Sequence, residues 1–147
     1  MTTTNAALRD WVAETAKLTQ PEHIHWCTGS DTERDDLTDL MLTRGDLIAL
    51  DQATFPDCYL HRSHPSDVAR VEHLTFICTK NKDDAGPNNN WMDPAEAHRK
   101  VDGLFAGCMK GRTMYVMPYC MGPILSPYAR CGVEITDSPY VVLNMRI

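Results

Sequence analysis

The chain has 147 residues, of which 43% are hydrophobic and 23% are charged, and its formal net charge at pH 7 is −6. This composition is typical of a soluble globular protein, and the length predicts a single domain over residues 1–147. The negative charge argues against a nucleic-acid partner that is bound by neutralising its phosphates.

Residues 113–129 carry no charge, but they do not predict a membrane segment. The run is shorter than the ~20 residues that a spanning helix needs, and prolines and glycine interrupt it. The six cysteines include no CxxC pair, and no secretory signal precedes them. We therefore expect a cytoplasmic protein with free thiols and no membrane partner.

The first half of the chain predicts a helix over 6–18, a strand entering a turn over 23–30, a helix over 33–44, and a short strand over 46–51. Leu8, Val12 and Leu18 lie near one face of the first helix. The segment from Ser30 to Glu33 is typical of a helix cap, and Gly45 is well placed to end the second helix.

The second half predicts a loop over 56–70, a strand over 71–79, a loop over 81–90, a helix from Pro94, and strands over 113–117 and 140–147, which are joined by turns and the segment 132–136. The segment 71–79, "VEHLTFICT", is rich in β-branched and aromatic residues. Asp93 is a predicted cap, with Pro94 at the first helical position. The alternation of elements predicts an α/β fold with a mixed sheet flanked by helices.

Two patterns suggest ligand chemistry without establishing it. The segment 107–113, "GCMKGRT", approaches a phosphate-binding loop, but its spacing differs and Arg112 stands where lysine is needed. A basic turn before a strand is the favoured alternative.

The pairs His23 with His25 and His61 with His64 would allow a metal site, yet no carboxylate or cysteine stands at a spacing that completes either pair. Hydrogen-bonded surface histidines are therefore favoured.

Arg70 lies at the junction between a loop and the predicted strand over 71–79, where functional side chains are often presented. Its guanidinium could hold a carboxylate through two parallel hydrogen bonds, which lysine cannot do. Pairing with Asp67 or Glu72 is the alternative, and spacing alone favours that alternative.

Six stretches in order resemble the GTP-dependent phosphoenolpyruvate carboxykinases, most closely the bacterial members. They are "LTQPEHIHWCTGS" (18–30), "DVARVE" (67–72), "TFICT" (75–79), "DAGPNNNWM" (84–92), "GCMKGRTMYVMPYCMGP" (107–123) and "TDSPYVV" (136–142). The resemblance covers nearly the whole chain and implies part of the N-terminal domain of that family. Two departures are His64 in the turn before "DVARVE" and Ile124-Leu125 where the family has Leu-Gly.

The resemblance implies a reaction: oxaloacetate and GTP give phosphoenolpyruvate, GDP and CO2, in gluconeogenesis. It also implies that Arg70 matches the family's mobile-loop arginine, which binds the substrate carboxylate. Members use manganese and GTP, but the motifs for the manganese ligands and the nucleotide do not occur in these residues. We expect neither to bind this chain, and we expect it to be inactive alone.

The resemblance further implies that the chain is a truncated N-terminal domain whose missing partner is a C-terminal nucleotide-binding domain. The apolar run over 140–147 then looks like a cut strand. Two alternatives remain open: a stand-alone, non-catalytic binding or assembly module that self-associates through the cut sheet edge, and, far less favoured, a small enzyme that uses the histidines and a metal.

Overall fold

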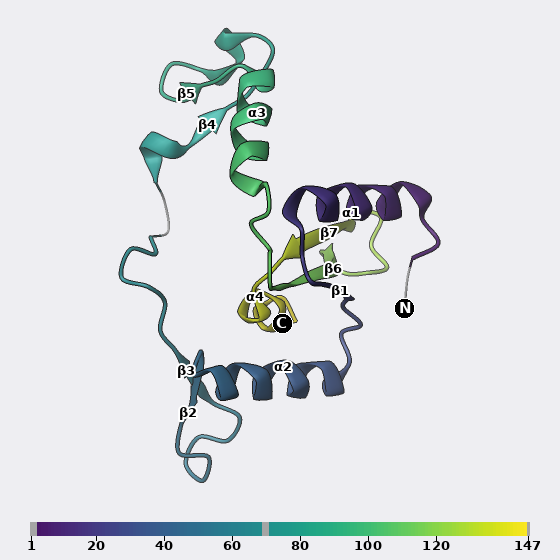
Figure 1. Ribbon diagram of the computed structural model, residues 1–147, viewed down its shortest axis with the longest axis vertical. Coiled ribbons are helices and arrows are strands. Elements are labelled where there is room, and N and C mark those ends of the chain that lie inside the picture. Colours follow the sequence, from purple (N-terminus) through teal and green to yellow (C-terminus); the bar gives the residue numbers. More distant parts are fainter. Residues whose placement is uncertain (1–2, 69–70, 147) are drawn as a thin grey trace.

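The computed structural model describes residues 3–68 and 71–146, and a three-stranded sheet lies at its centre (Figure 1). The strand order is β1 (His23–Trp26), β6 (Thr113–Met121) and β7 (Arg130–Thr136). Strand β1 runs parallel to β6, whereas β7 runs antiparallel to it. The sheet is therefore mixed, which confirms the predicted α/β class.

Strand β6 is buried on both faces, because its four residues from Met114 to Met117 are each at most 5% exposed. Successive side chains of a strand point to opposite faces. Met114 and Val116 pack against Val12, whereas Tyr115 and Met117 pack against Leu37 and Val142. A strand that is covered on both sides is a continuous apolar run, and "MYVM" has that pattern.

Helices cover the two faces of this sheet (Figure 1). Helix α1 (Ala6–Thr19) supplies Val12 to one core cluster. Helices α2 (Asp31–Arg44) and α4 (Pro139–Asn144) supply Leu37 and Val142 to the other cluster. The centre of the molecule is thus three-layered, and β1 leads directly into the turn before α2.

The predicted helix signals are confirmed for α2 and for α3 (Pro94–Phe105). The Ser30 side chain accepts a hydrogen bond from the Glu33 amide, and Gly45 ends α2 with φ of 78°. That left-handed conformation is accessible to glycine at little cost. The Asp93 side chain accepts hydrogen bonds from the first turn of α3.

The remaining elements lie away from the central sheet (Figure 1). Strands β2 (Leu47–Ala49) and β3 (Tyr59–His61) form an antiparallel pair. Strands β4 (Phe76–Ile77) and β5 (Asn90–Trp91) form a short parallel pair, with the 3₁₀ turns η1 (Glu72–Leu74) and η2 (Lys82–Ala85) beside them.

The predicted strand over 71–79 is wrong for most of its length. It forms η1 and then the two-residue strand β4. The Asn90 side-chain amide donates hydrogen bonds to the carbonyls of Glu72 and Thr75 and so holds the segment in a turn. Leu74 is 65% exposed. β-propensity reflects packing between neighbouring strands, and β5 offers only two residues to pair with.

The predicted strand over 140–147 is also wrong, because residues 139–144 form α4. The Ser138 side chain accepts a hydrogen bond from the Val141 amide, and Pro139 stands at the first helical turn, where its missing N–H costs nothing. Val142 is 1% exposed against the sheet. The cut strand expected there is thus absent from the described residues, and β1 and β7 are the outer strands of the central sheet.

The uncharged residues 113–129 form β6 and the turn that follows it. Across residues 3–68 and 71–146, none of the helices is both long enough and apolar enough to cross a membrane.

Ser138→Ala is expected to lower the free energy of unfolding by about 1 kcal/mol, because it removes the N-terminal cap of α4. Urea denaturation followed by circular dichroism measures this change. Ser138→Asp should restore most of the loss, and Ser63→Ala, at an exposed loop serine, is the matched control. Equal midpoints for Ser138→Ala and Ser63→Ala would show that the cap contributes nothing.

Candidate functional site

The turn over 107–112 does not form a phosphate cradle. The Gly107 amide donates to the Leu18 carbonyl at 2.8 Å, the Met109 amide to Thr19 at 2.9 Å, and the Lys110 amide to Gly107 at 3.2 Å. A cradle needs N–H groups that are free to meet the anion. These bonds instead tie the turn to the end of α1, and Arg112 pairs with Asp137 at 2.6 Å. The alternative of a basic turn before a strand is confirmed.

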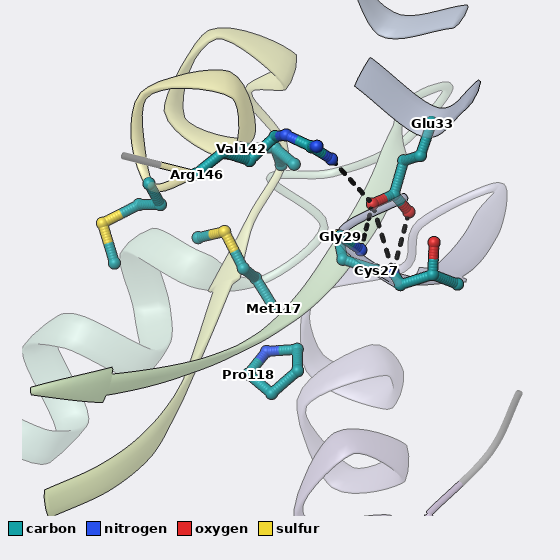
Figure 2. A pocket seen from close by; sticks show the side chains of 9 residues that line it. Cys27, Gly29, Glu33, Met117, Pro118, Val142 and Arg146 are labelled. Carbon is teal, nitrogen blue, oxygen red and sulfur yellow. Dashed lines mark hydrogen bonds and ion pairs between the residues drawn. The ribbon is translucent and has the colours of Figure 1, made fainter. Parts of the chain in front are cut away.

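Polar groups surround Glu33, in the first turn of α2, and Figure 2 shows those of Gly29 and Arg146 beside its carboxylate. The Glu33 side chain is only 6% exposed. Its Oε1 accepts hydrogen bonds from His25 Nε2 at 2.7 Å and from the Thr28 amide at 3.0 Å. Its Oε2 accepts from the Gly29 amide at 2.8 Å and from the Thr28 amide at 3.1 Å. A buried carboxylate therefore organises the turn between β1 and α2.

Local sequence explains this arrangement. Strand β1 is a short run that ends at Trp26, and the turn reverses at Gly29, whose φ of 73° suits glycine. Ser30 then caps α2 and brings Glu33 back over the turn. The imidazole of His25 lies edge-on to the Tyr115 ring, with centroids 5.6 Å apart. The neighbouring strand β6 thus orients the histidine.

Two opposing effects act on the Glu33 carboxyl. Burial raises its pKa, but the hydrogen bonds from His25, Thr28 and Gly29 and the nearby His25 charge outweigh burial, so the pKa lies below its ordinary value. Burial, followed by the Glu33 charge, raises the pKa of the Cys27 thiol to about 11. At neutral pH the cluster therefore holds a carboxylate beside an uncharged thiol.

Arg146 also faces this carboxylate (Figure 2). Its Nη1 lies 4.0 Å from Glu33 Oε2 and donates a hydrogen bond to the Ser30 carbonyl at 2.7 Å. Between them lies a cavity of about 190 Å³ lined by Cys27, Thr28, Gly29, Glu33, Met117, Pro118, Val142, Met145 and Arg146. The cluster is thus reachable from a cavity as well as from the surface.

His25, Cys27 and Glu33 could hold a metal ion, because their ligand atoms all lie within 4.8 Å of one another. The fold brings Cys27 and Glu33 beside His25, a combination that the sequence spacing did not indicate. His25 is hydrogen-bonded to Glu33, and His23 is 72% exposed near Glu22, as the favoured interpretation of hydrogen-bonded surface histidines expects. Two features of the sequence could have indicated this cluster. Cys27 follows His25 by two residues, and Glu33 comes shortly after the turn at Gly29.

The second histidine pair does not form a shared site. His61 Nδ1 lies 2.7 Å from the Asp46 carbonyl, and its ring stacks on Tyr140 at 3.9 Å. His64 Nδ1 lies 2.6 Å from the Ser66 hydroxyl. These contacts confirm hydrogen-bonded histidines as the better interpretation here.

Arg70, the predicted substrate residue, lies outside the described residues. The loop before it turns at His64, whose carbonyl accepts a hydrogen bond from the Asp67 amide at 2.8 Å. His64 and Asp67 line an open cleft that Arg44, Arg62 and Arg112 also line. The choice between a substrate role for Arg70 and pairing with Asp67 or Glu72 stays a prediction.

All six cysteines are free, as expected. Cys120 and Cys131 stand directly opposite each other on β6 and β7. Burial raises the pKa of the Cys120 thiol, and the neighbouring Cys131 raises it further. The Cys120 thiol is therefore not activated as a nucleophile.

Comparison with known proteins identifies the family. The family described as phosphoenolpyruvate carboxykinase N-terminal domain matches residues 10–147. The chain belongs to this family. It is 59% identical over 145 residues to phosphoenolpyruvate carboxykinase (GTP) of Anaeromyxobacter dehalogenans strain 2CP-C. This match covers 99% of the chain and 24% of that relative.

Two further carboxykinase relatives show the same coverage. Phosphoenolpyruvate carboxykinase (GTP) of Chlamydia abortus is 54% identical over 140 residues, covering 95% of the chain and 23% of the relative. The carboxykinase (GTP) of Corynebacterium jeikeium is 50% identical over 145 residues, and this match covers 99% of the chain and 24% of the relative. The chain thus spans about a quarter of the length of the carboxykinases it matches.

The described residues do not fit the manganese that the resemblance implies, nor the GTP in the relatives' names. Mn²⁺ prefers oxygen and nitrogen ligands, whereas the His25 cluster includes a thiol with a raised pKa. In the turn over 107–112, the amides of Gly107 and Met109 donate to α1, the Cys108 amide donates to Phe105, and the amides of Lys110 and Arg112 donate within the turn. Within residues 3–68 and 71–146, neither group therefore has a fitting set of ligands.

Proposed function

We propose that the chain is the N-terminal part of a GTP-dependent phosphoenolpyruvate carboxykinase. In that role it takes part in converting oxaloacetate and GTP into phosphoenolpyruvate, GDP and CO2, in the cytoplasm. The observation that carries the proposal is the 59% identity over 145 residues to a protein of that name. The mixed sheet and the free cysteines are compatible with it.

The chain's own contribution is the binding of the substrate's carboxylate through Arg70. Oxaloacetate and phosphoenolpyruvate both carry a carboxylate that the reaction leaves intact. A guanidinium that holds this group by two parallel hydrogen bonds keeps the reacting carbons in one orientation through decarboxylation and phosphorylation. Holding the substrate in this way contributes to rate by positioning, without any proton transfer by the arginine.

The remainder of the enzyme supplies the manganese site, the nucleotide pocket and the phosphoryl-transfer groups, so we propose a C-terminal nucleotide-binding domain as the chain's partner. Manganese there would stabilise the enolate that decarboxylation produces. The chain alone is then a substrate-binding part without catalytic turnover, and residues 1–147 act as one domain within the larger protein.

A chimera tests this division. The matching N-terminal quarter of the Anaeromyxobacter dehalogenans carboxykinase is replaced by this chain, and GTP-dependent formation of phosphoenolpyruvate from oxaloacetate is measured. Activity within about tenfold of the parent enzyme is expected, because the replaced region is 59% identical. The chain alone, at equal concentration, should show no turnover above background.

Either of two results would contradict the proposal. A folded but inactive chimera would show that the chain no longer serves as the N-terminal part of such an enzyme. Turnover by the chain alone would show that the catalytic groups are not confined to the remainder.

A further inference from the structure

We propose that His25, Cys27 and Glu33 form a binding site for a zinc ion, with a fourth position open to water or to a small ligand. The site lies at the turn between β1 and α2. It goes beyond the proposed carboxykinase role and does not depend on it.

The three ligand types are those that zinc takes in proteins. Imidazole nitrogen, thiolate sulfur and carboxylate oxygen bind zinc at about 2.0–2.3 Å, with tetrahedral geometry. Ligand atoms around such an ion lie roughly 3.3–3.8 Å apart, by the geometry of a tetrahedron with those bond lengths. Here they lie within 4.8 Å of one another, and His25 Nε2 is 2.7 Å from Glu33 Oε1. Shifts of roughly 1 Å in side-chain positions would therefore admit the ion.

His25 can make such a shift most easily. Its side chain is 44% exposed, and its Nε2 contact with Glu33 is the one interaction that zinc would replace. The edge of the imidazole rests against the Tyr115 ring, which limits its rotation. The histidine is thus free to move outward by a small amount while it keeps its direction toward the carboxylate.

Glu33 is already held as a single-oxygen ligand. Its Oε2 accepts hydrogen bonds from the Gly29 and Thr28 amides and faces Arg146 at 4.0 Å. Its Oε1 faces His25 and also accepts a hydrogen bond from the Thr28 amide at 3.0 Å. Hydrogen bonds to the second oxygen are the usual outer support of a metal-bound carboxylate. An ion at Oε1 would compete with one Thr28 bond, while Oε2 would keep the turn anchored through the Gly29 and Thr28 amides.

The charges of the ligands suit a dication. The buried carboxylate supplies one negative charge, although Arg146 Nη1 lies 4.0 Å from its Oε2 and offsets part of that charge. Zinc binding would displace the thiol proton to water and form a Zn–S bond, because a coordinated thiol is deprotonated outright. The two anionic ligands then balance the +2 charge of the ion. The thiol selects zinc over Mg²⁺ or Mn²⁺, which prefer oxygen.

The test is zinc titration of the metal-free chain by isothermal calorimetry, with Co²⁺ as a spectroscopic probe. We expect one zinc per chain and, with Co²⁺, a sulfur-to-metal charge-transfer band in the near ultraviolet. Cys27→Ser should abolish that band and weaken zinc binding at least tenfold. His25→Gln should also weaken binding at least tenfold, although its amide can still donate to Glu33.

Matched controls are His23→Gln, on the same strand, and Cys58→Ser, at an exposed thiol; both should bind zinc as the parent does. Circular dichroism confirms folding of each variant. The absence of zinc binding by the folded parent would overturn the proposal. So would zinc affinities of Cys27→Ser and His25→Gln equal to that of the parent. Carboxykinase activity of the chimera is a separate readout, so either proposal can fail alone.

Discussion

Glu33→Ala is expected to lower the free energy of unfolding by about 3 kcal/mol in the presence of a chelator. The substitution strips hydrogen-bond acceptors from the Thr28 and Gly29 amides and from His25. Unsatisfied buried donors cost about 1–3 kcal/mol each. Water from the adjoining cavity can partly satisfy these donors, so the total destabilisation is smaller than the sum over the three donors. Urea denaturation of the metal-free chain measures the effect.

Two comparison variants separate the carboxylate's role from a general effect on α2. Asp39→Ala, at an exposed position of the same helix, should change the free energy of unfolding by less than about 0.5 kcal/mol. Glu33→Gln keeps one acceptor oxygen and should lie between alanine and the parent. A loss below about 1 kcal/mol for Glu33→Ala would mean that water replaces the carboxylate and that the turn is held by Gly29 and the Ser30 cap.

The parts of the fold that sequence predicts well are those determined by neighbouring residues. Ser30 and Gly45 bound α2, and Asp93 with Pro94 begins α3, as expected. Each signal acts within one turn of helix, so tertiary contacts have little opportunity to override it. The apolar run of β6 was equally clear, because burial on both faces leaves no polar position in "MYVM".

The two failed strands depend on partners that lie far away in the sequence. Segment 71–79 has the composition of a strand. The Asn90 side chain, however, donates hydrogen bonds to the carbonyls of Glu72 and Thr75 and holds them in a turn. Segment 140–147 is rich in valine, yet the Ser138 cap and the burial of Val142 against β6 favour a helix. Composition gives the tendency of a segment, whereas the available neighbour decides its structure.

The Glu33 cluster was missed for a related reason. His25 and Glu33 are eight residues apart, a spacing that matches no regular metal motif, and the Gly29 turn alone brings them together. Arg70 shows the converse. Its spacing favoured local pairing, and only resemblance to the carboxykinases indicated a substrate role, which no contact among the described residues tests.

Arg70→Ala in the chimera is therefore expected to lower kcat/KM for oxaloacetate about 30-fold or more. A charge-assisted, two-bond contact to a carboxylate is worth about 2 kcal/mol or more, which corresponds to that factor in rate. Steady-state kinetics at saturating GTP measure the change. The KM for GTP should stay unchanged, because the arginine is proposed to touch only the carboxylate substrate.

Arg70→Lys and Arg9→Ala complete the experiment. Lysine keeps the charge but loses the planar pair of donors, so most of the defect should remain. Arg9 is an exposed arginine of α1, and its loss should leave kinetics as in the parent chimera. Full activity of Arg70→Ala would assign the arginine to local pairing with Asp67 or Glu72. A defect of equal size in Arg9→Ala would instead indicate a general effect of lost positive charge, since exposed cations also steer anionic substrates toward a site.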